Sequence, residues 1–136
     1  SPMAEGILKS LAKDDEDVVI LSGGLFAPEG RGASVKAVSA AKELGIDIST
    51  HQAKNVGPDV IAQADLILTM TEAHKRALTD VYGAASDKTY TIMEYTGQNG
   101  EIADPYGGSL DVYRKCASQL YEVLNAVYRK MRGEGS

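Results

Sequence analysis

The chain has little of what several protein classes depend on. It holds one cysteine, Cys116, so no internal disulfide can form and a cytoplasmic location is expected. Its histidines, His51 and His74, lie far apart with no cysteine near either, so zinc-ligand spacing is absent and neither a metal nor another cofactor is expected. No apolar run approaches the ~18 to 20 residues that cross a bilayer, and no secretory pattern is present, so no membrane partner is expected.

A surplus of basic residues is also lacking. Lysine and arginine number 14 against 19 aspartate and glutamate residues, which gives a net charge of −5. Binding to the phosphate backbone of a nucleic acid needs a basic face, so nucleic acid is not an expected partner. A negative protein can still bind a phosphorylated substrate in a locally positive pocket. The length and mixed composition predict a single domain over residues 1–136, expected to be a monomer.

Helices and short apolar strands alternate along the chain. Apolar spacing predicts helices over residues 3–13, 33–44, 58–64, 72–82 and 109–132. Apolar runs predict buried strands over residues 18–21, 65–70 and 88–93. This alternation predicts an α/β fold in which a mainly parallel sheet carries helices on both faces, in three layers. Ligands of such sheets bind beyond the carboxyl ends of the strands, so the loops after Leu21, Met70 and Met93 are expected to face a site.

A glycine-rich loop, residues 96–108, precedes the predicted last helix and contains Asp104-Pro105-Tyr106. Pro105 fixes its own φ and restricts Asp104 to extended conformations, which can aim a carboxyl at one point. An aimed carboxyl beside an aromatic side chain suits a general acid that protonates a leaving group. Asp-Pro pairs are also common in turns before helices, so these residues alone leave both interpretations open.

The first six residues read Ser-Pro-Met-Ala-Glu-Gly and predict the start of a helix. Ser1 is placed to cap it, and Pro2 suits its first turn. The free amides at such a start can bind an anion, although most helices begin with a simple cap. This segment alone therefore also leaves a structural and a functional interpretation open.

Four segments taken together resemble the low-molecular-weight protein tyrosine phosphatase family. They are Ser-Pro-Met-Ala-Glu at 1–5, Ser-Gly-Gly-Leu-Phe at 22–26, Ala-Asp-Leu-Ile-Leu-Thr-Met at 64–70 and Asp-Pro-Tyr at 104–106, in the family's order. The resemblance implies the family's three-layer parallel fold. It also implies a reaction in which a cysteine takes the phosphoryl group as phosphocysteine and water then hydrolyses it. The expected partners are a phosphorylated protein and inorganic phosphate or a similar oxyanion.

The resemblance assigns roles to five residues. Asp104 matches the general acid, and Ser1 matches the hydroxyl residue that hydrogen-bonds the nucleophilic sulfur. Tyr106, Phe26 and Pro105 match positions that contact the substrate. These expectations concern the chemistry of one site, built from the chain's start, residues 22–26 and the loop before the last helix.

The family's Cys-x5-Arg loop has no counterpart within these residues. Cys116 lies in the middle of the predicted last helix, and Glu122 rather than an arginine follows six residues later. The resemblance places the first central strand and this loop ahead of Ser1, with the strand between those at 18–21 and 65–70. The chain as given is therefore expected to lack the nucleophile, to be inactive and to fold poorly on its own.

The substrate and the function class leave alternatives. The glycines after Tyr106 resemble the arginine-specific bacterial branch, whereas tyrosine-specific members often carry a second aromatic there, so phosphoarginine is favoured over phosphotyrosine. The related arsenate reductases are excluded because they need additional cysteines. Two other functions stay open: a non-catalytic binding or scaffold module derived from the phosphatase fold, and an α/β protein that binds a phosphorylated small molecule at Ser1.

Overall fold

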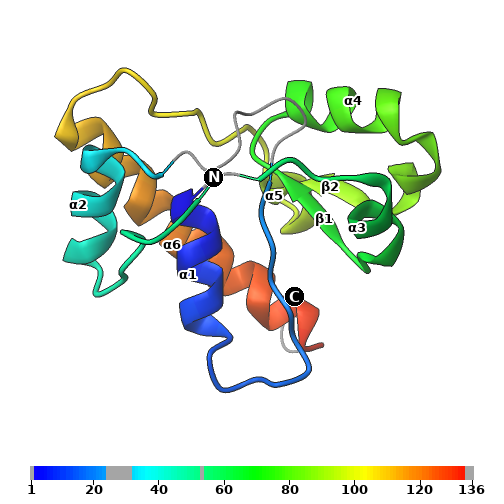
Figure 1. Ribbon diagram of the computed structural model, residues 1–136, viewed down its shortest axis with the longest axis horizontal. Coiled ribbons are helices and arrows are strands. Elements are labelled where there is room, and N and C mark those ends of the chain that lie inside the picture. Colours follow the sequence, from blue (N-terminus) through cyan, green and yellow to red (C-terminus); the bar gives the residue numbers. More distant parts are fainter. Residues whose placement is uncertain (1, 24–31, 53, 134–136) are drawn as a thin grey trace.

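The structure is a computed structural model that describes residues 2–23, 32–52 and 54–133 (Figure 1). In chain order its elements are α1 (Pro2–Leu11), α2 (Val35–Glu43), α3 (Pro58–Gln63), β1 (Ile67–Thr69), α4 (Glu72–Val81), the 3-10 helix η1 (Gly83–Lys88), β2 (Thr89–Thr91), α5 (Ile92–Tyr95) and α6 (Leu110–Met131). The five predicted helices are all present, and their bounds fall within about two residues of those expected. The predictions for Ser1 and Phe26 lie outside the described residues.

Two strands form the sheet within the described ranges. β1 and β2 are parallel, with Ile67 opposite Thr89, and α4 and η1 make the crossover between them. Alternate residues of β1 face opposite sides of the sheet, as the period of a strand requires. Ile67 packs with a small core formed by Ile61, Leu78 and Ala85, whereas Leu68 packs against the main core. The strand pair therefore lies between two layers, which confirms the predicted α/β architecture.

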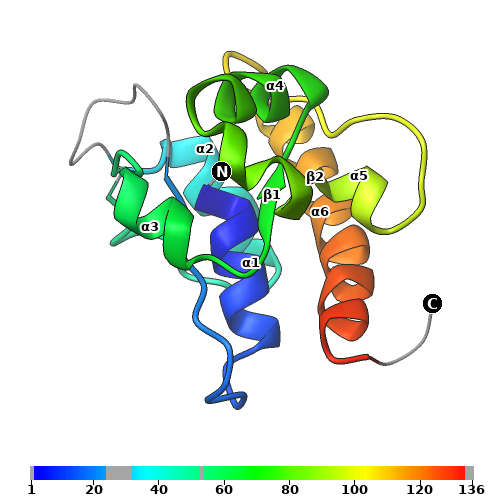
Figure 2. The ribbon, with the colours of Figure 1, turned by 90° about the vertical axis from the view of Figure 1, so that its right-hand side faces the viewer.

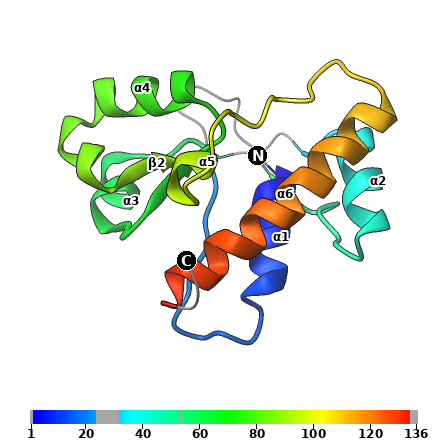
Figure 3. The ribbon, with the colours of Figure 1, turned by 180° about the vertical axis from the view of Figure 1, so that it is seen from behind.

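The main core is made by α1, α2 and α6, which pack against one another (Figure 3). Helix α6 is the longest element and buries Leu120, Leu124 and Val127 almost completely. Helix α1 contributes Met3 and Ile7 to the same core. The apolar face of each helix is thus covered by the other two, and burial of each large side chain contributes roughly 1.5 to 3 kcal/mol.

Helix α2 ends where the sequence predicts, at Gly45. Gly45 has a φ of 79°, a backbone conformation that glycine adopts without the penalty of a Cβ. Its N–H donates to the Lys42 carbonyl, and the next N–H, of Ile46, donates to the Ala41 carbonyl. These two bonds satisfy carbonyls that the helix end leaves without partners, and Ile46 is buried against the core.

Residues 18–21 were expected to form a buried strand, and this prediction is wrong for the described structure. The segment is extended beside α1 but belongs to no sheet (Figures 1 and 2). Val19 is 82% exposed and Leu21 is 65% exposed. A strand is stabilised by hydrogen bonds to a neighbour, and the described part of the chain places no strand beside this segment. The β-branched run favours an extended backbone but does not supply the neighbouring strand.

The predicted third strand, residues 88–93, is shorter than expected. β2 ends at Thr91, and helix α5 begins at Ile92. The Thr91 hydroxyl accepts a hydrogen bond from the Glu94 N–H, and the Glu94 carboxylate accepts one from the Thr91 N–H. This reciprocal cap follows from the Thr-x-x-Glu pattern, so the sequence did contain the information that a helix starts here.

Candidate active site

The loop between α5 and α6 crosses the carboxyl end of β1 (Figure 1). The Ile102 N–H donates to the carbonyl of Met70, the residue that follows β1, at an N···O distance of 3.2 Å. The Ile102 side chain is completely buried in the main core. The loop is therefore anchored at the edge of the sheet where ligands of parallel sheets bind. This position was predicted for the loops after Met70 and Met93, and the second of these carries Asp104 to the same edge.

Glu101 gives the loop a second anchor. Its carboxylate accepts a hydrogen bond from the Glu72 N–H at 2.6 Å, at the start of α4. The first amides of a helix have no partners within it, and its dipole favours a negative charge there. Glu101 and Ile102 thus fix the backbone just before Asp104. Sequence reasoning missed both residues, although a single isoleucine in a polar, glycine-rich loop indicates an apolar anchor.

Asp104 begins a tight turn. Its carboxylate accepts a hydrogen bond from the Tyr106 N–H at 3.0 Å, and the Gly108 N–H donates to the Pro105 carbonyl at 2.8 Å. Gly107 is the third residue of the turn that begins at Pro105, and it has a φ of 80°, which glycine adopts without the penalty of a Cβ. Asp104 is exposed, so a ligand can reach its carboxyl from solvent. The two interpretations of Asp104-Pro105, as a turn and as the position of a general acid, are therefore compatible, because the turn orients the Asp104 carboxyl.

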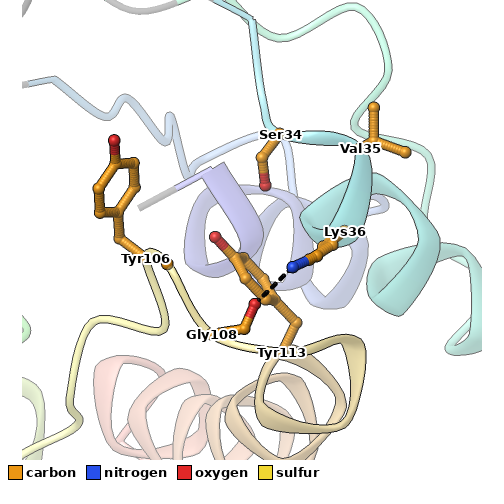
Figure 4. Close-up of a pocket in the computed structure, with 7 residues that line it drawn as sticks. Ser34, Val35, Lys36, Tyr106, Gly108 and Tyr113 are labelled. Carbon is orange, nitrogen blue, oxygen red and sulfur yellow. Dashed lines mark hydrogen bonds between the residues drawn. The ribbon is translucent and has the colours of Figure 1, made fainter.

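A cavity of about 370 Å³ lies beside this turn (Figure 4). The lining comes from the start of α2, the turn and the first part of α6: Ser34, Val35, Lys36, Tyr106, Gly107, Gly108 and Tyr113. Tyr106 is 76% exposed, which suits a contact with a bound molecule. Asp104 and Pro105 do not line the cavity. The cavity therefore flanks the loop that carries Asp104 (residues 97–109, the acid loop) and is not itself the place where Asp104 would act.

Cys116 lies beneath the same loop. Its thiol donates to the Ala103 carbonyl, with a sulfur–oxygen distance of 3.9 Å. Burial raises the pKa of the Cys116 thiol, and the charge of Asp104 raises it further. A nucleophilic cysteine needs a lowered pKa, so this environment is opposite to the one required. Cys116 is therefore a buried residue that packs against the loop and is not a nucleophile.

Glu5 connects α1 with two other segments. Its carboxylate lies 3.1 Å from Nδ1 of His51 and 3.8 Å from the Lys9 ammonium, and its side chain is 15% exposed. Burial alone would raise the pKa of Glu5, but a hydrogen bond with Ser22, the charge of Lys9 and the bond with His51 outweigh it and lower that pKa. This network holds the first helix, residue 22 and residue 51 together, next to the predicted anion-binding start of α1.

The structure brings Asp104, Pro105 and Tyr106 together on one anchored turn, while Ser1 and Phe26 are not described. Among the described residues, no group of three His, Cys, Asp or Glu side chains is arranged to hold a metal ion. No helix in the described ranges is both long and apolar enough to span a bilayer. The site is thus an exposed carboxyl with an adjoining aromatic side chain, held by backbone hydrogen bonds.

Comparison with known proteins gives a consistent result. A family model described as low molecular weight phosphotyrosine protein phosphatase matches residues 1–135. A protein-arginine-phosphatase of Bacillus subtilis is 35% identical over 97% of this chain and 89% of its own length. Among solved structures, a low-molecular-weight protein tyrosine phosphatase from T. tengcongensis is 44% identical with a TM-score of 0.90, over 96% of this chain and 90% of that one.

A further solved structure shows the chemistry of a relative. It is the YwlE arginine phosphatase in a variant form whose active-site serine, in place of cysteine, is phosphorylated. It matches with a TM-score of 0.91 and 34% identity, over 97% of this chain and 88% of that chain. In that relative the residue that replaces the cysteine carries a phosphoryl group.

Proposed function

This chain belongs to the low-molecular-weight phosphotyrosine protein phosphatase family, and from that premise we propose that it hydrolyses phosphoarginine or phosphotyrosine on proteins through a phosphocysteine, with Asp104 as the general acid. The observation that carries the proposal is the position of Asp104. Its carboxyl is exposed on a turn that Glu101 and Ile102 anchor at the carboxyl end of β1. Relatives that act on phosphoarginine and on phosphotyrosine support the substrate class.

In the proposed reaction a thiolate attacks phosphorus and the bond from phosphorus to the leaving nitrogen or oxygen breaks. Asp104 donates its proton to that atom, and the resulting carboxylate then accepts a proton from the water that hydrolyses the phosphocysteine. Cys116 is not the thiolate, because it is buried and the pKa of its thiol is raised. The proposed reaction therefore needs a thiolate other than Cys116, which is the single cysteine of the sequence. Inorganic phosphate leaves as the product.

The turn supports phosphoarginine as the first substrate to test. Two glycines, Gly107 and Gly108, follow Tyr106, so the rim of the site has one aromatic ring here rather than two. A shallow, adaptable rim suits the flexible alkyl chain of arginine, whereas a second aromatic ring would stack on a phenol. Tyr106 and Pro105 would contact the substrate side chain, and Ser1 and Phe26, which lie outside the described residues, are proposed to belong to the same site.

The test uses the full-length product of the open reading frame that contains these 136 codons. Asp104→Asn removes the proton donor while keeping the size of the side chain and its ability to accept the Tyr106 N–H bond. We expect kcat/KM for phosphoarginine and phosphotyrosine peptides to fall by about 100-fold to 10,000-fold. Asp80→Asn, an exposed carboxylate on α4 away from the turn, is the matched control and should leave kcat/KM unchanged.

Each other outcome points to a different conclusion. A wild-type protein that binds inorganic phosphate but does not turn over either peptide would contradict the enzyme and favour a binding or scaffold module. Turnover that survives Asp104→Asn would remove Asp104 from the mechanism. Faster hydrolysis of phosphotyrosine than of phosphoarginine would reject the preferred substrate and leave the reaction in place.

A further inference from the structure

Lys36 stands at an unusual place in its helix. It is the second residue of α2, whose first turn contains no acidic residue. The N-terminal end of a helix disfavours a positive charge, so a lysine here is locally unfavourable. The side chain does not point along α2 but reaches across to the acid loop, where its ammonium donates to the Gly108 carbonyl at an Nζ···O distance of 2.7 Å (Figure 4). This contact joins residues that are 72 positions apart.

The accepting carbonyl belongs to the turn that carries Asp104. Gly108 closes this turn through its N–H bond to Pro105, four residues after the carboxyl. The turn is also packed closely, because a Cβ on Gly108 would lie 2.9 Å from both the Pro105 carbonyl oxygen and a methyl carbon of Val112. A shift of the Gly108 carbonyl is therefore transmitted to the short segment between it and Asp104.

Helix α2 is a firm base for such a contact. It buries Ala37, Ala40 and Ala41 against the main core. At its other end Glu43 forms an ion pair with Arg114 of α6 at 2.9 Å. The two helices are thus fixed to each other. Lys36 then connects α2 to the acid loop, which leads into α6. Glu101 and Ile102 hold the loop before Asp104, and Lys36 holds it after Asp104.

We propose that Lys36 is a positioning residue for the acid, which it holds through the Gly108 carbonyl so that the Asp104 carboxyl is aimed at the leaving group. The inference rests on the proposed function and goes beyond it, because Lys36 acts here through the Gly108 carbonyl and not through a contact of its own with the reacting atoms. Misplacement of a catalytic group lowers the rate of the step that uses the group more than it lowers binding. Loss of Lys36 should therefore lower the rate for substrates whose leaving group needs a proton, and should change it little for substrates whose leaving group departs without one.

The experiment compares three variants of the full-length gene product. Lys36→Met removes the donor and keeps the length of the side chain, Lys36→Arg restores a donor, and Lys42→Met changes an exposed lysine at the opposite end of α2 as the control. The readout is kcat/KM for two substrates. Phosphotyrosine has a poor leaving group, the tyrosine phenolate, which needs a proton, whereas the nitrophenolate of p-nitrophenyl phosphate needs little protonation. We expect Lys36→Met to lower kcat/KM by about threefold to tenfold for phosphotyrosine and by less than about twofold for p-nitrophenyl phosphate.

Lys36→Arg should recover most of the loss, and Lys42→Met should match the wild-type protein with both substrates. Amide hydrogen exchange adds a readout that does not need turnover: residues 106–110 should exchange several-fold faster in Lys36→Met than in Lys42→Met. Equal losses for both substrates, or exchange unchanged from the control, would overturn the positioning role while the phosphatase proposal stands. A wild-type protein without any turnover overturns the proposed function and the positioning role together, even if exchange shows that the contact exists.

Discussion

Two segments that flank the core show opposite behaviour: the acid loop, residues 97–109, and the extended segment 17–23. The acid loop is polar and glycine-rich, yet it is fixed by the buried Ile102, by Glu101 at the start of α4 and by Lys36. The extended segment contains the apolar run Val-Val-Ile-Leu, yet it leaves Val19 and Leu21 largely exposed. From composition alone, the polar loop would be expected to be exposed and weakly held, and the apolar segment to be buried.

The difference shows that order depends on available partners rather than on local preference. The acid loop meets a free carbonyl at Met70, free amides at the start of α4 and an apolar gap in the main core. The extended segment is attached near its end, where Ser22 bonds to Glu5 and Gly23 lies close to Val56, but its apolar residues meet no strand in the described structure. Each predicted effect below tests one side of this contrast.

The largest effect should come from the apolar anchor of the acid loop. Ile102→Ala removes a completely buried side chain and leaves a cavity in the main core. The expected loss is about 2 to 5 kcal/mol of unfolding free energy. Urea unfolding of the full-length gene product, with the same urea dependence for both proteins, measures it.

Val35→Ala is the matched control for this prediction, because it truncates a β-branched side chain that is 82% exposed. It should change the unfolding free energy by no more than about 0.5 kcal/mol. A loss below about 1 kcal/mol for Ile102→Ala would show that the loop relaxes around the missing side chain. The hydrogen bonds of Glu101 and Lys36 would then be its main anchors, and the contrast between the segments would be one of polar contacts.

A middle-sized effect should come from Glu5, which attaches the extended segment. The lowered pKa of its carboxyl means that the folded protein binds a proton there less readily than the unfolded chain does. The carboxylate therefore stabilises the fold at pH values above its ordinary pKa, and this contribution is lost as the pH falls through the lowered value. Glu5→Gln should cost about 1 to 2 kcal/mol of unfolding free energy at neutral pH.

The stability difference between wild-type protein and Glu5→Gln should shrink towards zero in acid, because the wild-type carboxyl is then protonated and uncharged. Urea unfolding at a series of pH values between neutral and strongly acidic measures this convergence. Parallel curves that never approach each other would assign the loss to packing or to altered hydrogen bonds rather than to the charge of Glu5.

Patterns within one segment were enough to predict much of the molecule. Helical spacing located α2, α4 and α6, and the expected parallel sheet placed the loop after Met93, which contains Asp104, at the carboxyl ends of the strands. Contacts between distant segments were not predictable in this way. Nothing in the sequence around Lys36 indicates Gly108, because the two meet only after α2 packs on α6.

The extended segment failed as a prediction for a similar reason. A β-branched run favours extended backbone, which the segment does have, but a strand also needs the backbone hydrogen bonds of a neighbour. The end of β2 is a different case, since its capping pattern at Thr91 and Glu94 is local and the helix there could have been predicted.

The smallest effect should come from the apolar residues of the extended segment. Val19→Thr keeps the branched shape of a side chain that is 82% exposed, so the unfolding free energy of the full-length gene product should change by no more than about 0.5 kcal/mol, measured by urea unfolding. A change within this range would mean that Val19 faces solvent in the folded protein, whereas a loss of about 1 kcal/mol or more would mean that residues beyond the described ranges cover it. The second outcome would trace the contrast with the acid loop to a partner that the loop finds within the described ranges and the extended segment does not.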